Sequence, residues 1–145
     1  MTTKRMDHVG VVVTDLKAAT EFFVALGMEL LGEGPASGQW VDDIAGLPGI
    51  NIDIAFLRTP DGHGQLELTS FRSPAAVTGG SNAPNAVGLR RVMFTVEDIH
   101  DTLARLRLHG GVLVGEVAQY EDSYLLCYVR GPEGIIVSLS QELTP

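Results

Sequence analysis

Hydrophobic and other residues alternate near the start of the chain, which is typical of a half-buried β-strand. The positions on the apolar side of this strand are Val9, Val11 and Val13. His8 falls on the opposite side, because successive side chains of a strand point to opposite faces. Asp15 is a favoured helix N-cap, Gly27 is a favoured C-terminal stop, and the apolar residues between them recur at helical spacing. The pattern therefore predicts a strand and a helix that pack together, with His8 left across the sheet.

The chain repeats this pattern once. The stretch from Leu89 to Val114 matches that from Met6 to Leu30 without a gap. The equivalent pairs at one constant offset are Asp15 with Asp98, Gly27 with Gly110, and His8 with Arg91. We therefore expect two copies of one module. In the second copy Arg91 and Met93 take the side of the strand that faces away from the helix.

The rest of the first copy predicts a short strand near residues 29–33 and a hairpin with strands at about 50–58 and up to Phe71. On the returning strand, Leu66 and Leu68 share one face and Glu67 lies on the other. If the leucines join the core beside the helix, Glu67 stands on the same side of the sheet as His8.

The segment between these strands, residues 34–49, is rich in glycine and proline and carries the only tryptophan, Trp40. We interpret it as a loop with one helical turn. Its apolar side chains, Trp40, Val41 and Ile44, suit a lid over a pocket, and packing against the edge of the module is an equal alternative.

The rest of the second copy predicts strands near residues 112–117, 123–130 and 135–141. Tyr124, Leu126 and Tyr128 share one strand face, and Ser138 shares a face with its neighbours two residues away. Residues 72–87, which contain many proline, glycine, serine and asparagine residues, are typical of a linker.

The predicted fold class is α+β, with two βαβββ modules at about residues 6–71 and 88–141 forming one domain over residues 1–145. Neither four-stranded sheet covers both of its faces alone, so we expect the two to pair into a curved cup with the helices outside. The residues expected to converge inside the cup are His8, Glu67, Arg91, Tyr124, Tyr128 and Ser138.

Composition narrows the class of function. The formal net charge is −8 and the basic residues form no run, so nucleic acid is a poor partner. An apolar run near 18 residues and a signal peptide are both absent from the sequence, which favours a cytoplasmic protein with no membrane partner. The single cysteine, Cys127, excludes an internal disulfide and fits a small buried residue.

Four segments in this order, together with the repeat, resemble the vicinal oxygen chelate superfamily, which includes glyoxalases, bleomycin-resistance proteins and extradiol dioxygenases. The segments are DHVGVVVTDL, GQLEL, GLRRVMFTVEDI and YVRGPEGIIVSL. The resemblance covers nearly the whole chain. It implies a glyoxalase/bleomycin resistance/dioxygenase fold and a small-molecule ligand or substrate.

The resemblance also implies that metal ligands of related proteins correspond here to His8, Glu67, Arg91 and Ser138. Histidine and glutamate bind metals well, whereas arginine stays protonated and has no lone pair to donate. At about 4 Å and an effective dielectric constant near 20, two unit charges repel by about 4 kcal/mol, and a divalent ion roughly doubles this cost. We therefore expect a partial metal site of His8 and Glu67 and no cofactor, with Zn, Ni, Mn or Fe as the alternative.

Three functions follow from these residues. The first is binding or sequestration of a small organic molecule, or metal-independent chemistry, with Trp40, Met93, Tyr124, Tyr128 and Ser138 as ligand contacts. In the second, a lyase, isomerase or epimerase resembling glyoxalase I moves a proton next to a carbonyl, with Glu67, Arg91 and His8 in catalysis. The third is an interaction protein with a vestigial cup. The resemblance also implies a homodimer.

Overall fold

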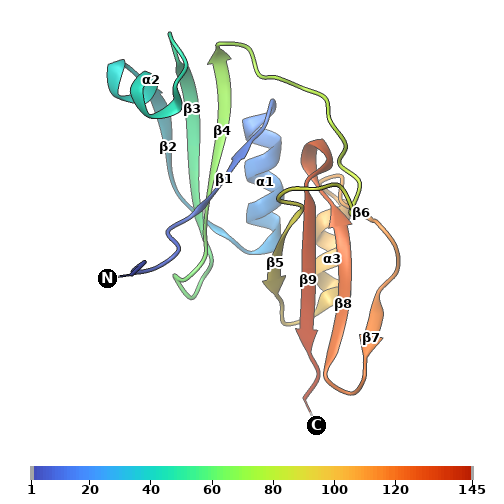
Figure 1. The fold of residues 1–145 in the computed structure, drawn as a ribbon. Coiled ribbons are helices and arrows are strands. Elements are labelled where there is room, and N and C mark those ends of the chain that lie inside the picture. Colours follow the sequence, from blue (N-terminus) through green and yellow to red (C-terminus); the bar gives the residue numbers. More distant parts are fainter. Residues whose placement is uncertain (1, 145) are drawn as a thin grey trace. The chain divides into compact units, whose positions relative to one another are not determined.

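The computed structural model describes residues 2–144. They form two compact units, and the boundary between these units in the sequence lies between Thr78 and Gly79. Each unit contains a strand, a helix and further strands, in the order βαβββ with insertions (Figure 1). The fold is α+β, as the hydrophobic pattern predicts. No helix among residues 2–144 has the length and hydrophobicity needed to cross a bilayer.

The first unit has one sheet with the strand order β1-β4-β3-β2. β1 is parallel to β4, and the other neighbouring strands are antiparallel. Its elements are β1 (Val9–Val12), α1 (Leu16–Leu26), β2 (Glu29–Ser37), α2 (Gln39–Ala45), β3 (Asn51–Arg58) and β4 (Gln65–Ser73).

Helix α1 begins and ends where its capping residues predict. The Asp15 side chain accepts a hydrogen bond from the backbone N–H of Ala18, and Gly27 ends the helix with a φ of 123°. Phe22 and Phe23 are fully buried with their rings edge to face. Leu66 and Leu68 of β4 are buried as well, which confirms that they join the core and that Glu67 faces the other side.

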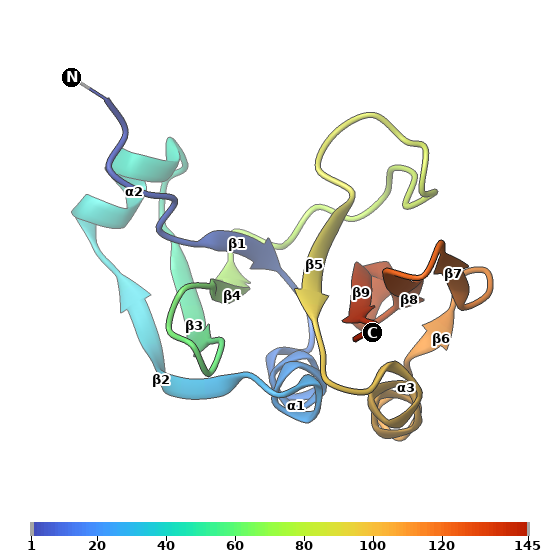
Figure 2. The same ribbon diagram turned by 90° about the horizontal axis from the view of Figure 1, so that it is seen from below.

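The second unit repeats the scheme with the strand order β5-β9-β8-β6, and β7 also pairs with β8. Helix α3 lies along one face of this sheet (Figure 2). Its elements are β5 (Arg91–Thr95), α3 (Ile99–Arg107), β6 (Val112–Leu113), β7 (Ala118–Tyr120), β8 (Tyr124–Arg130), a 3₁₀ turn (Pro132–Gly134) and β9 (Ile136–Glu142). Asp98 caps α3, and Ile99, Leu103 and Leu106 are buried, as predicted.

Three predicted bounds were wrong. β2 continues to Ser37 instead of ending near Glu33. It is an edge strand, which tolerates Pro35 because proline has no backbone N–H to donate to a neighbouring strand. β4 continues to Ser73, past the predicted end at Phe71. The strand predicted at 112–117 breaks after Leu113 and resumes as β7, and Gly115, which weakens a strand, lies in the break.

Candidate functional site

His8 and Glu67 are brought together by the parallel pairing of β1 and β4. Gly10 is the register partner of Glu67, and His8, two residues earlier, projects on the same side of the sheet. Nε2 of His8 lies 3.0 Å from Oε2 of Glu67. The two side chains are partly exposed, so a small molecule can reach them. They lie on the face opposite α1.

The second ring nitrogen of His8 also contacts a carboxylate. Its Nδ1 atom lies within hydrogen-bonding distance, 2.9 Å, of Oδ2 of Asp7. This hydrogen bond, helped by the charges of His8 and Arg5, lowers the pKa of Asp7 from its ordinary value. A neutral imidazole donates one hydrogen bond, whereas a protonated imidazole donates to both carboxylates. His8 is thus held between two acids and can act as a proton donor or acceptor. Sequence reasoning missed Asp7, although its position next to His8 was a signal.

The segment that carries Trp40 folds as α2 and is anchored through a neighbouring residue. Val41 is buried in an apolar cluster with Ile50, Ile52 and Ile54. The carboxylate of Asp42 accepts hydrogen bonds from the backbone N–H groups of Gly49 and Ile50, which fixes the end of the helix to the start of β3. The expected lid of Trp40, Val41 and Ile44 is therefore wrong for Val41, which faces the core.

Trp40 itself is 61% exposed and lies in the first turn of α2. This exposure shows that the ring is not packed into the edge of the unit, which was one of the two alternatives. A contact between Trp40 and a ligand stays a prediction.

On the second sheet, Arg91 and Tyr128 are in contact across an intervening strand. Arg91 is paired with Ile136 of β9, and Tyr128 of β8 is paired with Ser138 of the same strand. The central carbon of the Arg91 guanidinium lies 5.0 Å from the centre of the Tyr128 ring. This distance is typical of a cation–π contact. The guanidinium therefore reaches across β9, on the face opposite α3.

Met93 and Ser138 lie next to this pair in register. Met93 is 54% exposed, whereas Ser138 is only 4% exposed because it sits between Met93 and Tyr128. Met93 can thus contact a ligand over a large area, and Ser138 offers little surface. Ser138 is therefore a weaker candidate for ligand binding than its neighbours Met93 and Tyr128.

Tyr124 lies four residues from Tyr128, at the far end of β8, which places its Cα about 13 Å away at the usual rise of a strand. It borders a surface cavity lined by Asp122, Ser123, Glu142 and Leu143. Tyr124 shares the open face with Tyr128 but belongs to another end of it. A ligand that contacts Arg91 must therefore be long to reach Tyr124.

Arg130 is a polar residue of this face that sequence reasoning missed. Its register partner, Ile136, is also the partner of Arg91, so the two arginines flank one residue of β9. Nη1 of Arg130 donates to the carbonyl oxygens of Asn82 and Gly134, each at 2.9 Å. The alternation along β8 was a signal, because Arg130 shares the face of Tyr128.

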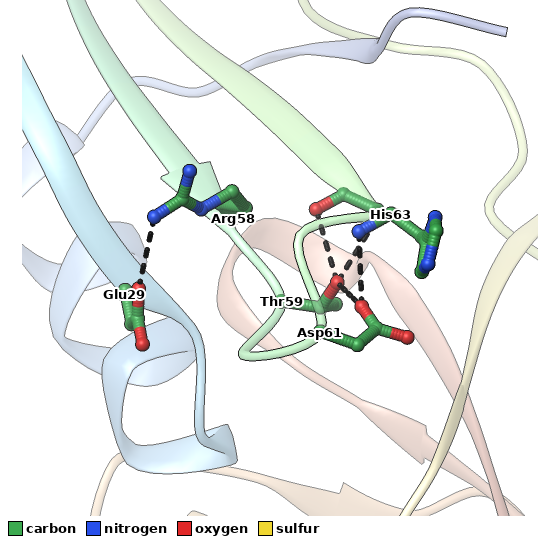
Figure 3. A network of polar contacts seen from close by, with 6 residues as sticks. Glu29, Arg58, Thr59, Asp61 and His63 are labelled. Carbon is green, nitrogen blue, oxygen red and sulfur yellow. Dashed lines mark hydrogen bonds and ion pairs between the residues drawn. The ribbon is translucent and has the colours of Figure 1, made fainter. Parts of the chain in front are cut away.

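His63 does not join His8 and Glu67. It lies in the turn before β4, where its backbone N–H donates to Asp61 and its ring points away from the polar contacts of that turn (Figure 3). Cys127 is buried, and burial raises the pKa of its thiol, so it acts as a small apolar residue.

The residues that could hold a metal are His8 and Glu67, and two protein ligands fall short of the three that a catalytic zinc site normally has. Among residues 2–144 there is no group of three or more histidine, cysteine, aspartate or glutamate side chains with metal-binding geometry. Within the first unit, His8 and Glu67 therefore supply two ligands of such a site. The approach of His8 and Glu67 to Arg91 stays a prediction.

Comparison with known proteins gave one family model and several solved structures. The model for the Glyoxalase/Bleomycin resistance protein/Dioxygenase superfamily matches residues 5–139. A search of curated proteins found no match.

Among the solved structures, a glyoxalase family protein from Bacillus cereus is 46% identical, with a TM-score of 0.95 over 99% of this chain and 97% of that one. One from Enterococcus faecalis is 23% identical, with a TM-score of 0.65 over 97% and 99%. A glyoxalase I mutant from Zea mays is 19% identical, with a TM-score of 0.68 over 97% of this chain and 46% of that one. The last two similarities concern the fold alone.

Proposed function

Because the chain belongs to the Glyoxalase/Bleomycin resistance protein/Dioxygenase superfamily, we propose that it binds a small organic molecule without a resident metal ion. One observation carries this proposal. Arg91 corresponds, by the family resemblance, to a metal ligand of related proteins. Here it forms a cation–π contact with Tyr128 on an open sheet face. Such a pair recognises organic groups and repels a cation.

The proposed ligand contacts are the exposed residues of the open faces. Arg91 holds an oxyanion, and Met93 and Tyr128 contact the apolar part of the ligand. Trp40 supplies an exposed aromatic ring from α2. We assign Tyr124 and Ser138 a smaller share, because one lies at the far end of β8 and the other is buried.

If the protein is also an enzyme that works without a metal, His8 and Glu67 are the groups that move a proton. Their atoms lie 3.0 Å apart, and Asp7 restrains the imidazole from its other side. A proton next to a carbonyl can be removed by such a base.

The second candidate is a divalent-metal lyase, isomerase or epimerase similar to glyoxalase I. The contact between His8 and Glu67 favours it, because both are good metal ligands and they already lie together. It requires further ligands such as water, since the described residues of the first unit supply only this pair. A bound metal would polarise the carbonyl of the substrate.

Metal content and bound organic molecules separate the two candidates. We expect native mass spectrometry of the purified full chain to show a co-purified organic molecule. We expect elemental analysis to show far less than one metal per chain after loading with Ni²⁺ or Zn²⁺ and desalting. Near-stoichiometric metal would overturn the metal-free proposal and support the second candidate.

We also propose a homodimer, which sedimentation analysis would measure directly.

A further inference from the structure

We propose that Arg91 and Tyr128 form a binding site for a carboxylate that is attached to an aromatic or other apolar group. This inference rests on the proposed ligand-binding function and names the class of ligand. It concerns the second unit alone, and it does not depend on His8 or Glu67.

The first argument is the set of partners of the guanidinium. The group carries five N–H donors. The contact with Tyr128 places the centre of the guanidinium 5.0 Å from the ring centre and engages no oxygen acceptor. Arg91 is exposed, and within residues 2–144 its side chain contacts no carboxylate. A carboxylate can thus accept two parallel hydrogen bonds from it.

The second argument is preorganisation. A free arginine side chain loses rotamer entropy when a ligand fixes it. The Tyr128 ring already restrains the guanidinium on the sheet, so part of this cost is met before the ligand arrives. An arginine that merely extended into solvent would lack this advantage.

The third argument is the local charge. The chain has a net charge of −8, so its overall field repels an anion, and an anion site needs a local concentration of positive charge. Arg130 lies on the same face as Arg91 across Ile136, and its hydrogen bonds go to neutral carbonyl groups. These two arginines supply the local positive charge.

The fourth argument is the apolar surface next to the two arginines. Met93, two residues after Arg91 on β5, is exposed, and Leu126, two residues before Tyr128, lies on the same face of β8 as Tyr128. A free inorganic anion would leave this surface in water. A carboxylate on a flat apolar group would bury it, with the charge at Arg91 and the body over Met93.

The test compares three probes on the ¹⁵N-labelled full chain by NMR, with the Nε–Hε signal of Arg91 as the readout. The probes are 2-naphthoate, its neutral analogue 2-naphthamide, and inorganic phosphate. We expect 2-naphthoate to shift this signal and to bind at least about tenfold more tightly than either other probe. Equal binding of the amide would overturn the role of the charge. Equal binding of phosphate would overturn the role of the apolar body.

Variants test the assignment to Arg91, and their binding is followed by the backbone amide signals of the labelled chain, because Arg91→Gln and Arg91→Lys lack the Nε–Hε signal. We expect Arg91→Gln to weaken 2-naphthoate binding at least about tenfold and to leave 2-naphthamide unchanged. Arg91→Lys keeps the charge but loses the planar fork of the guanidinium. Its affinity for 2-naphthoate should therefore lie between that of the wild type and that of Arg91→Gln. Arg107→Gln removes the same charge from the last turn of α3 and should have no effect. Unchanged naphthoate binding in Arg91→Gln would contradict the inference.

The failure of this inference differs from the failure of the proposed function. A neutral or cationic organic molecule in the native mass spectrum, with no preference for naphthoate, would refute the carboxylate class and keep the binding function. A stoichiometric metal with naphthoate still bound through Arg91 would refute the metal-free function and keep the carboxylate site.

Discussion

The imidazole of His8 lies 3.0 Å from the carboxylate of Glu67, although the two residues stand at opposite ends of the first unit's sequence. The contact exists because the first and last strands of that unit are parallel neighbours. Parallel strands need a long crossover, and the helix α1 and the other two strands provide it. The βαβββ order therefore brings together a histidine and a glutamate that no local motif connects.

Glu67→Gln tests whether this pair serves mainly to stabilise the fold. The two side chains are partly exposed, and exposed ion pairs contribute about 0–1 kcal/mol. We expect the free energy of unfolding, measured by urea denaturation, to change by less than about 1 kcal/mol. A loss of several kcal/mol would mean that the pair is structural and would weaken its functional assignment.

Arg91→His tests the equivalence of Arg91 with a metal ligand, because it restores an imidazole at that position. We expect the affinity for Ni²⁺ or Zn²⁺, measured by calorimetry, to rise at least about tenfold, or about 1.4 kcal/mol. Arg107→His is the matched control, since it adds a histidine at the exposed end of α3. If both variants bind metal equally, Arg91 does not occupy the expected position.

Val41→Ala and Trp40→Ala separate the two roles of α2. Val41 is buried among isoleucines, so its truncation should lower the free energy of unfolding by about 1–3 kcal/mol. Trp40 is exposed, so its truncation should leave the stability within about 0.5 kcal/mol while it weakens ligand binding. Thermal unfolding measures the stability of both variants, and titration with the organic molecule that co-purifies with the full chain measures the binding. Unchanged binding in Trp40→Ala would remove Trp40 from the site.

Asp61→Asn tests the turn between β3 and β4. The hydroxyl of Thr59 and the backbone N–H of His63 donate to Asp61 and lower the pKa of its carboxyl (Figure 3). A lowered pKa in the folded state stabilises the protein above the ordinary value of 3.8, and this stabilisation is lost as the pH falls through the folded value. We expect the variant to be less stable than the wild type at pH 7.

The difference in stability between wild type and Asp61→Asn should shrink as the pH falls below about 4. Urea unfolding at several pH values measures it. The exposed pair of Arg58 and Glu29 in the same region is a suitable control, since Glu29→Gln should change stability by less than about 1 kcal/mol. A constant difference for Asp61→Asn across this pH range would contradict the role assigned to its charge.

The sequence by itself determined the order of the elements and the face of each strand. Alternation assigned Val13 to the core and His8 to the open side, and it assigned Arg91 and Tyr128 to the open side of the second sheet. Capping residues determined where both main helices begin. These features were predictable because they depend on side-chain period and local hydrogen bonds, which act over a few residues.

Only the tertiary structure decided which residues of a face are neighbours. Alternation did not show that Arg91 meets Tyr128 instead of Tyr124, because that choice depends on the register of β5, β9 and β8. It also did not show that Val41 is buried while Trp40 is exposed, since this depends on how α2 packs on β3. Register and packing involve contacts between segments distant in sequence, and a local pattern does not contain them.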